Sequence, residues 1–339
     1  MTATLSTTPT GITVARGFRA AGVSAGIKAN GNLDLALIVS ETPANAAAVF
    51  TTNRAQAAPV LISLEHLKRS GGTARAIVVN SGCANACTGD EGMQVARAMA
   101  VETARLVSCP AEQVLVASTG VIGVALPIEK VRVGLPAAMQ ALAAEQGAAA
   151  ARAIMTTDPF PKEASTRVTI GGREIAIGGM AKGSGMIEPM MATMLGFVTT
   201  DAAVPKPLLD RALREAVDDT FNAITVDGEC STNDCVMLLA NGASGVEIGE
   251  ATYGSFVNGL RDVCRELALG IVRGGEGATK LVTVTVTNAA SRAEARRASS
   301  GAAAPVTLIV TSLVAPSPPR TMPSASSRQT AVSPARNAG

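Results

Sequence analysis

Aromatic side chains are almost absent from this sequence. Of its 339 residues none is Trp, one is Tyr and six are Phe. So few rings leave no platform on which the bases of a single strand could stack. The 29 Lys and Arg residues nearly balance 27 Asp and Glu and are scattered, without the basic stripe that a phosphate backbone selects. The scarcity of aromatic side chains and the lack of a basic stripe argue against a nucleic-acid-binding protein.

Histidine is equally scarce, since His66 is the only one. A Ser-His-Asp or Cys-His catalytic site would therefore have to use it. His66 lies in LISLEHLKRS, a segment expected to be helical, where it is interpreted as a solvated or capping residue. An enzyme built from this chain needs a catalytic base of another kind.

Long apolar runs are also missing. The longest, residues 306–315, falls well short of the roughly 20 residues that span a bilayer. Residues 1–26 are rich in Thr, Ala and Gly and lack the apolar centre of a secretory signal, so we expect a cytoplasmic protein. In that compartment six cysteines are expected to be buried thiols rather than a disulfide framework: Cys83, Cys87, Cys109, Cys230, Cys235 and Cys264.

Two common binding motifs are incomplete. GGEGATK lacks the G-x-x-x-x-G-K-[ST] spacing of a phosphate loop, and GSG lacks the rest of a dinucleotide fingerprint. The acidic neighbours Asp218, Asp219, Asp227 and Glu229 have no His or second carboxylate cluster to complete a metal-ligand set. The sequence predicts neither a nucleotide site nor a metal site.

What the sequence does contain is an alternation of strand and helix patterns. AIVV at residues 76–79 predicts a strand that leads into a Gly-rich loop, residues 80–90. Apolar residues at helical spacing follow over 95–106. VLVAS at 114–118 predicts a second buried strand, which leads into the turn TGVIG. The pattern is typical of an α/β fold with mixed sheets and packed helices.

The second half continues in the same way before the composition changes. Pro207 introduces a helix, and a further helix is predicted over residues 256–267. Val and Thr alternate over 281–287, which predicts a strand with one buried face. From residue 299 onward Ala, Ser, Pro, Thr and Arg dominate without any Asp or Glu, which is typical of disorder.

A lone Thr, Thr193, lies in the segment MAKGSGMIEPMMATMLGFVTTDA, residues 180–202. One interpretation is self-processing, in which the Thr193 hydroxyl attacks the carbonyl carbon of Ala192 and water opens the resulting ester. Thr193 would then be a new N-terminus, whose α-amino group has an ordinary pKa of about 7.7 to 8.0 and can deprotonate the hydroxyl of the same residue. The other interpretation is an ordinary core or strand threonine.

This segment resembles the signature of the ornithine acetyltransferases, also called glutamate N-acetyltransferases, in which the Ala-Thr bond of ATML is cleaved. Six further stretches resemble the same family in order, so that the resemblance extends from about residue 10 to about residue 295: AAVFTTNRAQAAPV (47–60), VNSGCANACTG (79–89), STGVIG (118–123), IMTTDPFPKEA (154–164), DDTFNAITVDGECSTND (218–234) and GGEGATKLV (274–282).

The resemblance implies a fold like that of the N-terminal-nucleophile enzymes, with an α chain of residues 1–192 and a β-chain core of 193–297. It implies that Thr193 is the nucleophile and that Thr119 and Gly120 form the oxyanion hole. The substrate contacts that it implies are Thr156, Lys182, Thr193 and Glu276. The residues alone leave open an ordinary turn at 119–120 and solvated surface charges at Lys182 and Glu276.

The reaction implied is the transfer of acetyl from N2-acetyl-L-ornithine to Thr193 and then to L-glutamate, in arginine biosynthesis. No bound cofactor is expected. Some family members also use acetyl-CoA and so act as amino-acid N-acetyltransferases, and the sequence leaves this activity open. The implied assembly has two α and two β chains.

Two alternatives follow from the sequence. One is an N-terminal-nucleophile amidase or aminopeptidase, which passes the acyl group to water. The other is an inactive truncated or frameshifted family member, because residues 298–339 replace the family's DPNWGR-like element and Asn-containing end.

Overall fold

The computed structural model describes residues 11–187, 194–291, 294 and 308–313. Its helices are α1 (Ala58–Arg69), α2 (Gly89–Val107), α3 (Ile128–Gln140), α4 (Gly147–Ala153), α5 (Lys206–Asp219) and α6 (Glu250–Arg273). Its strands are β1 (Phe18–Val23), β2 (Leu35–Phe50), β3 (Thr73–Cys83), β4 (Val114–Val121), β5 (Lys162–Ile170), β6 (Arg173–Lys182), β7 (Leu195–Thr200), β8 (Ile224–Thr225), β9 (Cys235–Ala240), β10 (Val282–Thr287) and β11 (Leu308–Leu313). These elements confirm the predicted mixed α/β fold.

Eight of these strands form one sheet in the order β4-β3-β2-β9-β7-β6-β5, with β1 also paired to β2. The long strand β2 joins the two halves, because its first part pairs with β1 and β3 and its last part pairs with β9. Within the sheet, β3 pairs with β4 and β7 pairs with β9 in parallel, and the other pairs are antiparallel.

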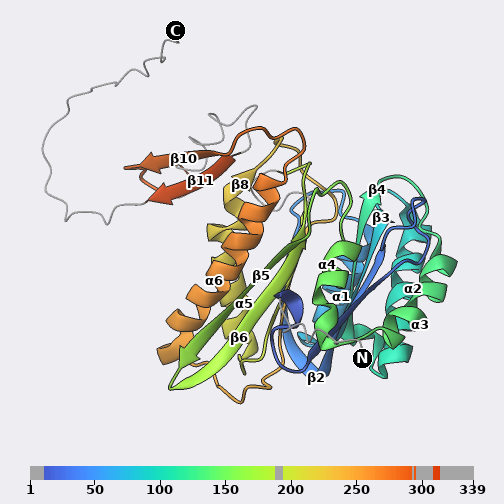
Figure 1. The fold of residues 1–339 in the computed structure, drawn as a ribbon, viewed down its shortest axis with the longest axis horizontal. Coiled ribbons are helices and arrows are strands. Elements are labelled where there is room, and N and C mark those ends of the chain that lie inside the picture. The colour runs from blue at the N-terminus through green and yellow to red at the C-terminus, as the bar shows by residue number, and fades with distance from the viewer. Residues whose placement is uncertain (1–10, 188–193, 292–293, 295–307, 314–339) are drawn as a thin grey trace, which may run out of the picture.

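Helices cover the two halves of the sheet separately (Figure 1). The apolar residues of α1, α2 and α3 pack against β2, β3 and β4, whereas α5 and α6 pack against β6, β7 and β9. A third apolar cluster includes residues of α4 and of both halves of the sheet. In α5 the buried residues recur at helical spacing behind Pro207 in the first turn, as the sequence predicted.

The two strands that lead to the predicted glycine-rich segments are longer than predicted. β3 continues to Cys83 and β4 to Val121, so the prediction of a loop from residue 80 and of a turn at 119–120 was wrong. The reason is that the parallel ladder continues through the pairs Ser81↔Thr119 and Gly82↔Gly120.

Two predictions about single residue types were also wrong. His66 is 4% exposed and its Nδ1 lies 2.8 Å from the carbonyl oxygen of Val114, so it is a buried residue between α1 and β4, neither solvated nor capping. Cys87 and Cys230 are exposed, which contradicts the expectation that all six cysteines are buried. No disulfide joins any of the six, all of which lie within the described residues.

A smaller sheet contains two strands that follow α6 and one strand that precedes it. β10 pairs in parallel with β11, which pairs with β8, and this sheet lies beside the end of α6 in Figure 1. The predicted alternation in β10 is present, although Val282, Val284 and Val286 are only half-buried. A strand at 308–313 contradicts the prediction of disorder for those six residues, and the rest of the segment 298–339 lies outside the described residues.

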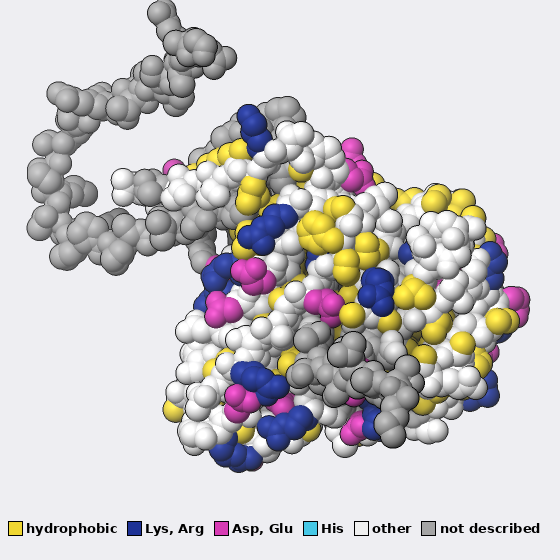
Figure 2. All heavy atoms as spheres, viewed as in Figure 1, with side chains coloured by type: hydrophobic (Ala, Val, Ile, Leu, Met, Phe, Trp, Pro, Cys, Tyr) yellow, Lys and Arg dark blue, Asp and Glu magenta, His cyan; other side chains and the backbone are white. Residues whose placement is uncertain are grey.

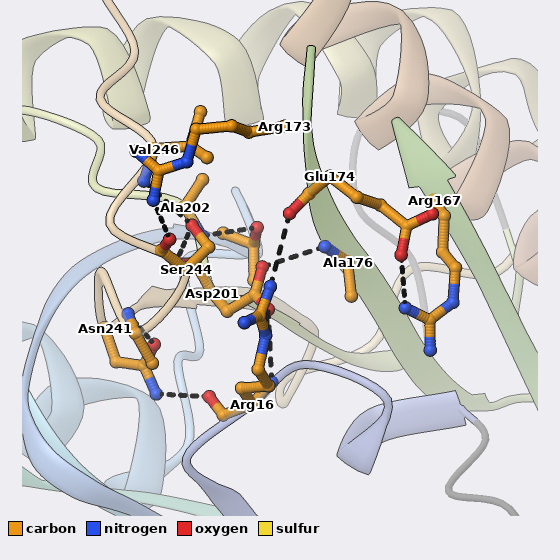
Figure 3. Close-up of polar contacts among 12 residues, drawn as sticks. Arg16, Arg167, Arg173, Glu174, Ala176, Asp201, Ala202, Asn241, Ser244 and Val246 are labelled. Atoms are coloured by element: carbon orange, nitrogen blue, oxygen red, sulfur yellow. Dashed lines mark hydrogen bonds and ion pairs between the residues drawn. The ribbon is translucent and has the colours of Figure 1, made fainter. Parts of the chain in front are cut away.

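A buried carboxylate, Asp201, follows the last residue of β7, Thr200, and fixes that end of the strand. Asp201 accepts hydrogen bonds from the backbone N–H of Ala176 at 2.8 Å and from Nε of Arg16 at 3.1 Å (Figure 3). Its side chain is 1% exposed. The backbone carbonyl of Asp201 accepts the Ser244 hydroxyl at 2.7 Å. The network ties β6, β7 and the segment after β9 together at one end of the sheet.

Charged side chains of both signs are interspersed on the face shown in Figure 2, without a large area of one sign. This distribution agrees with the scattered charges of the sequence. Among the described residues, no helix combines the length and the apolar character needed to cross a bilayer.

Candidate functional site

A cavity of about 840 Å³ opens where β3, β4 and β6 end. Thr119, Gly120, Thr156, Lys182 and Glu276 all line it, although they come from four separate parts of the chain. Ala192 and Thr193 lie outside the described residues. The structure therefore brings together every described residue that the resemblance assigned to the oxyanion hole or to substrate binding.

The backbone at Gly120 needs a glycine. Its φ is +132°, and a Cβ built there would lie 2.3 Å from the carbonyl carbon of Gly82 on the neighbouring strand. Gly82 has a φ of +102°, so two glycines with positive φ face each other across the ends of β3 and β4. Gly120 also lines the cavity, where a backbone N–H can stabilise developing negative charge.

Lys182, the last residue of β6, is buried beside Thr119 of the predicted oxyanion element, which consists of Thr119 and Gly120. It is 3% exposed, and its Nζ donates to Oγ1 of Thr119 at 3.1 Å. Burial lowers its pKa, although the Asp158, Asp234 and Glu276 carboxylates favour its charged form. The alternative of a solvated surface charge is therefore wrong for Lys182.

Asp158 is the anion at the centre of a buried cluster. Its side chain accepts hydrogen bonds from Nζ of Lys162 at 2.5 Å, from Gly183 N at 2.8 Å and from Thr156 N at 3.0 Å. Burial alone would raise the pKa of Asp158, but the charges of Lys182 and Lys162 outweigh burial and lower it. The cluster holds the predicted substrate residue Thr156 and the start of the segment after Lys182.

Glu276 reaches the cavity from the turn after α6. Its carboxylate accepts a hydrogen bond from the hydroxyl of Thr157, which is also 2.7 Å from the Ser184 hydroxyl. Its backbone N–H donates to the carbonyl oxygen of Ser184 at 2.5 Å. Glu276 is exposed on the cavity wall, where its charge is available to a ligand. Thr157, which supplies this hydroxyl, lines the cavity beside the predicted substrate residue Thr156.

Aspartates fix the described residues on both sides of the predicted cleavage site. Asp227 accepts hydrogen bonds from the backbone N–H groups of Met186 and Ile187, the latter at 2.8 Å. Asp234 accepts the backbone N–H of Met194, the residue after Thr193, at 2.8 Å. Cys235 N donates to the Met194 carbonyl oxygen at 3.1 Å, so both backbone groups of Met194 are held.

Asp234 is 1% exposed. Burial raises its pKa well above the usual range of an aspartate, and the Met194 N–H, the Ser231 hydroxyl and the Lys182 charge only partly oppose this rise. Among the described residues, no group makes a hydrogen bond of normal geometry to Oδ2 of Asp234. The site therefore contains a buried carboxyl group whose pKa is raised by burial.

Several residues of the cavity were not identified from the sequence. Asp227 and Glu229, considered there only as metal ligands, both line it. Asn233 also lines it and ties the two strand ends together, because its Nδ2 donates to the carbonyl oxygens of Ala84 at 2.7 Å and Ser118 at 2.9 Å. Lys28 lines the cavity as well, from the loop GIKANG at residues 26–31, and nothing in that sequence indicates that its lysine would reach the cavity. Within the described residues no group of three or more His, Cys, Asp or Glu is arranged to hold a metal ion.

The fold is that of the N-terminal-nucleophile hydrolases. The structure of L-aminopeptidase D-Ala-esterase/amidase from Ochrobactrum anthropi, described as a variant of that fold, matches with a TM-score of 0.52 over 81% of this chain and 89% of that chain. The two sequences are 13% identical, so this likeness concerns the fold alone.

The ArgJ family model matches residues 19–318, and this chain belongs to the ArgJ family. The arginine biosynthesis bifunctional protein ArgJ of Symbiobacterium thermophilum is 53% identical over 293 residues, which cover 85% of this chain and 72% of that protein. The protein of the same name from Geobacter sulfurreducens is 52% identical over 286 residues, covering 84% and 72%. The crystal structure of the Bacillus halodurans protein is 38% identical with a TM-score of 0.50, covering 54% of this chain and 94% of that chain.

Proposed function

We propose that this chain is an acetyltransferase of arginine biosynthesis that moves an acetyl group from N2-acetyl-L-ornithine to L-glutamate. The observation that carries the proposal is the cavity, in which a chain of the ArgJ family gathers Thr119, Gly120, Thr156, Lys182 and Glu276. The hydrolytic alternative has weaker support, because the aminopeptidases share only the fold, at 13% and 14% identity.

The reaction begins with cleavage of the chain between Ala192 and Thr193. The freed α-amino group of Thr193 takes the proton from the hydroxyl of the same residue, and the hydroxyl oxygen attacks the acetyl carbon of N2-acetyl-L-ornithine. The negative charge on the acetyl oxygen is stabilised at Thr119 and Gly120. The C–N bond then breaks, and ornithine leaves with the proton.

The second half-reaction reverses these steps with another amine. The α-amino group of L-glutamate attacks the acetyl-Thr193 ester, and the released hydroxyl regains its proton. Lys182 suits a carboxylate of either substrate, and Glu276 suits an ammonium group. N-acetyl-L-glutamate leaves, and Thr193 is ready for another cycle.

The assembly and the setting belong to the same proposal. We infer two chains from each precursor, one on each side of the bond between Ala192 and Thr193, in an assembly with two of each. The enzyme works in the cytoplasm, requires no bound cofactor or metal, and acts on small molecules. Acetyl-CoA is proposed as a second acetyl donor, and release of free CoA on mixing it with the enzyme and glutamate would test this activity.

The decisive test of the proposed function is the intact mass of the wild-type protein beside that of Thr193→Ala. The wild type is expected to give two fragments that divide at Ala192/Thr193, and the variant one uncut chain. Thr193→Ser should still be cut, because serine keeps the hydroxyl. The matched control is Thr103→Ala in α2, whose buried hydroxyl donates to the Met99 carbonyl at 2.8 Å.

Acetyl transfer is measured on the same samples. N2-acetyl-L-ornithine should add one acetyl group to the fragment that begins with Thr193, and L-glutamate should remove it. An uncut wild-type chain, or a cut chain that takes no acetyl group, would contradict the proposed function. Release of acetate from acetylornithine without glutamate would instead support the hydrolase.

A further inference from the structure

Lys28 is a cation of the cavity wall that the reaction described above does not use. It lies in the loop between β1 and β2, and its side-chain stem packs against Gly82, where a built Cβ would lie 3.1 Å from Cγ of Lys28. Because Gly82 pairs with Gly120, the stem lies over the strand ends that form the predicted oxyanion element. Lys28 is thus close to the reacting region.

Hydrogen bonds to the buried side chain of Asp34 fix the loop that carries Lys28. Asp34, which is fully buried, accepts the backbone N–H of Ala25 at 2.6 Å and that of Lys28 at 2.9 Å. Nζ of Lys28 donates to the carbonyl oxygen of Leu33 at 2.8 Å and to that of Met155 at 2.7 Å. Met155 precedes the cavity residue Thr156, so the ammonium group is held beside the substrate-binding segment.

An ammonium group has three N–H donors, and the carbonyls of Leu33 and Met155 accept two of them. Within the described part of the chain no third acceptor is hydrogen-bonded to Nζ of Lys28, although the residue lines the cavity. One charged donor is therefore available to a ligand. Burial lowers the pKa of Lys28, while the nearby Asp34 and Asp158 carboxylates favour its charged form.

The charges of the cavity differ in their fit to the two substrates. Its described lining contains two cations, Lys28 and Lys182, and three carboxylates, Asp227, Glu229 and Glu276. N2-acetyl-L-ornithine carries one carboxylate and one ammonium group, whereas L-glutamate carries two carboxylates. Lys182 can serve the α-carboxylate that both substrates have. The second carboxylate of glutamate needs a second cation.

We propose that Lys28 is a specificity-determining residue that binds the side-chain carboxylate of L-glutamate in the acceptor half-reaction. This inference rests on the proposed function. It assigns the remaining N–H of Nζ to a charge-assisted hydrogen bond with that carboxylate. N2-acetyl-L-ornithine has no matching group, so the donor half-reaction does not depend on Lys28.

The test uses Lys28→Met, which keeps the apolar stem and removes the charge, in the full chain. Acetyl-enzyme is first formed with N2-acetyl-L-ornithine, and its loss is then followed against the concentration of L-glutamate or of L-glutamine. The KM for glutamate is expected to rise about 10- to 100-fold, as for a lost charge-assisted hydrogen bond, with kcat less affected. The rates with glutamine and with acetylornithine should change by less than about threefold.

Two further variants separate this role from a structural one. Lys28→Arg keeps a cation with several donors and should retain the preference for glutamate over glutamine; if Lys28→Met does not fold, loss of that preference in Lys28→Arg contradicts the proposal. Lys206→Met is the matched control, because Nζ of Lys206 also donates to two protein oxygens, on Gly71 and Thr73, outside the cavity. It should leave both half-reactions unchanged.

The outcomes distinguish this inference from the proposed function. If Lys28→Met weakens glutamate and glutamine equally, or slows both half-reactions equally, Lys28 acts only through the carbonyls of Leu33 and Met155 and the proposal is wrong. If the wild type forms no acetyl-enzyme at all, the proposed function fails first and the role of Lys28 fails with it.

Discussion

Asp158→Asn should strongly destabilise this protein, because it removes the anion from a buried cluster that keeps two cations. Lys162 and Asp158 have side chains that are 1% and 0% exposed, and Lys182 is 3% exposed. Asparagine can still accept the Gly183 N–H, but it cannot balance either charge. Removing one partner of a buried ion pair costs about 3–5 kcal/mol. The free energy of unfolding should fall by roughly that amount at pH 7.

The assay is urea denaturation followed by circular dichroism, since the chain has no Trp to report by fluorescence. It is done in a Thr193→Ala background, which is expected to keep the chain in one piece. The matched control is Asp210→Asn, whose surface pair with Arg214 has side chains 48% and 62% exposed. Such an exposed pair contributes about 0.3–0.5 kcal/mol.

The effect of Asp158→Asn should also depend on pH. The pKa of Asp158 is lowered in the folded protein, so its ionised form stabilises the fold above the unfolded pKa of about 3.9 and this contribution is lost as pH falls through the folded pKa. The difference in the free energy of unfolding between Asp158→Asn and the protein that keeps Asp158 should therefore shrink below about pH 4. A loss no larger than that of Asp210→Asn, or one that persists unchanged in acid, would refute the reasoning.

Two further predictions concern the strand ends at the site. Gly120→Ala should lower the rate of acetyl-enzyme formation at least about 100-fold, because its Cβ would lie 2.3 Å from the backbone of Gly82. The control is Gly123→Ala, where φ is +80° but no atom lies within 4 Å of a built Cβ. It should cost only about 1–3 kcal/mol of strain and leave the rate of acetyl-enzyme formation unchanged. Asp234→Asn should leave the urea midpoint at pH 7 unchanged or higher. Burial raises the pKa of Asp234, so the folded state loses stability as pH rises from the unfolded pKa of about 3.9 through the folded pKa, whereas asparagine stays neutral and still accepts the Met194 N–H. Asp234→Ala should lower that midpoint, and equal losses in the two variants would contradict this view of Asp234.

The sequence predicted most of the fold because its apolar pattern is regular. The strands around 76–79 and 114–118, and the helices behind Pro207 and over 256–267, all exist, since period-2 and period-3.6 patterns reflect burial on one face of an element. The patterns could not indicate where β3 and β4 end. Polar and glycine residues at Asn80 to Gly82 look like a loop until a neighbouring strand supplies their hydrogen bonds.

The candidate site was predicted in part for a different reason. Resemblance located Thr119, Gly120, Lys182 and Glu276, which the structure places around one cavity, but their roles stay predictions. The electrostatics could not be predicted, because the cluster of Asp158, Lys162 and Lys182 depends on a contact between a loop and two strand ends. Lys28 was missed for the same reason, since a lysine in a polar loop is ordinarily a solvated charge.

The position of β7 makes cleavage before it compatible with a folded protein. β7 pairs with β6 on one side and with β9 on the other, and all six of its residues are buried. Buried aspartates hold both ends: Asp234 accepts the Met194 N–H, and Asp201 follows Thr200 and joins Ala176 and Arg16 (Figure 3). None of these contacts uses the bond between Ala192 and Thr193. A chain end created there would therefore lie one residue before a backbone group that the rest of the sheet holds in place, which is what a nucleophile at a new N-terminus requires.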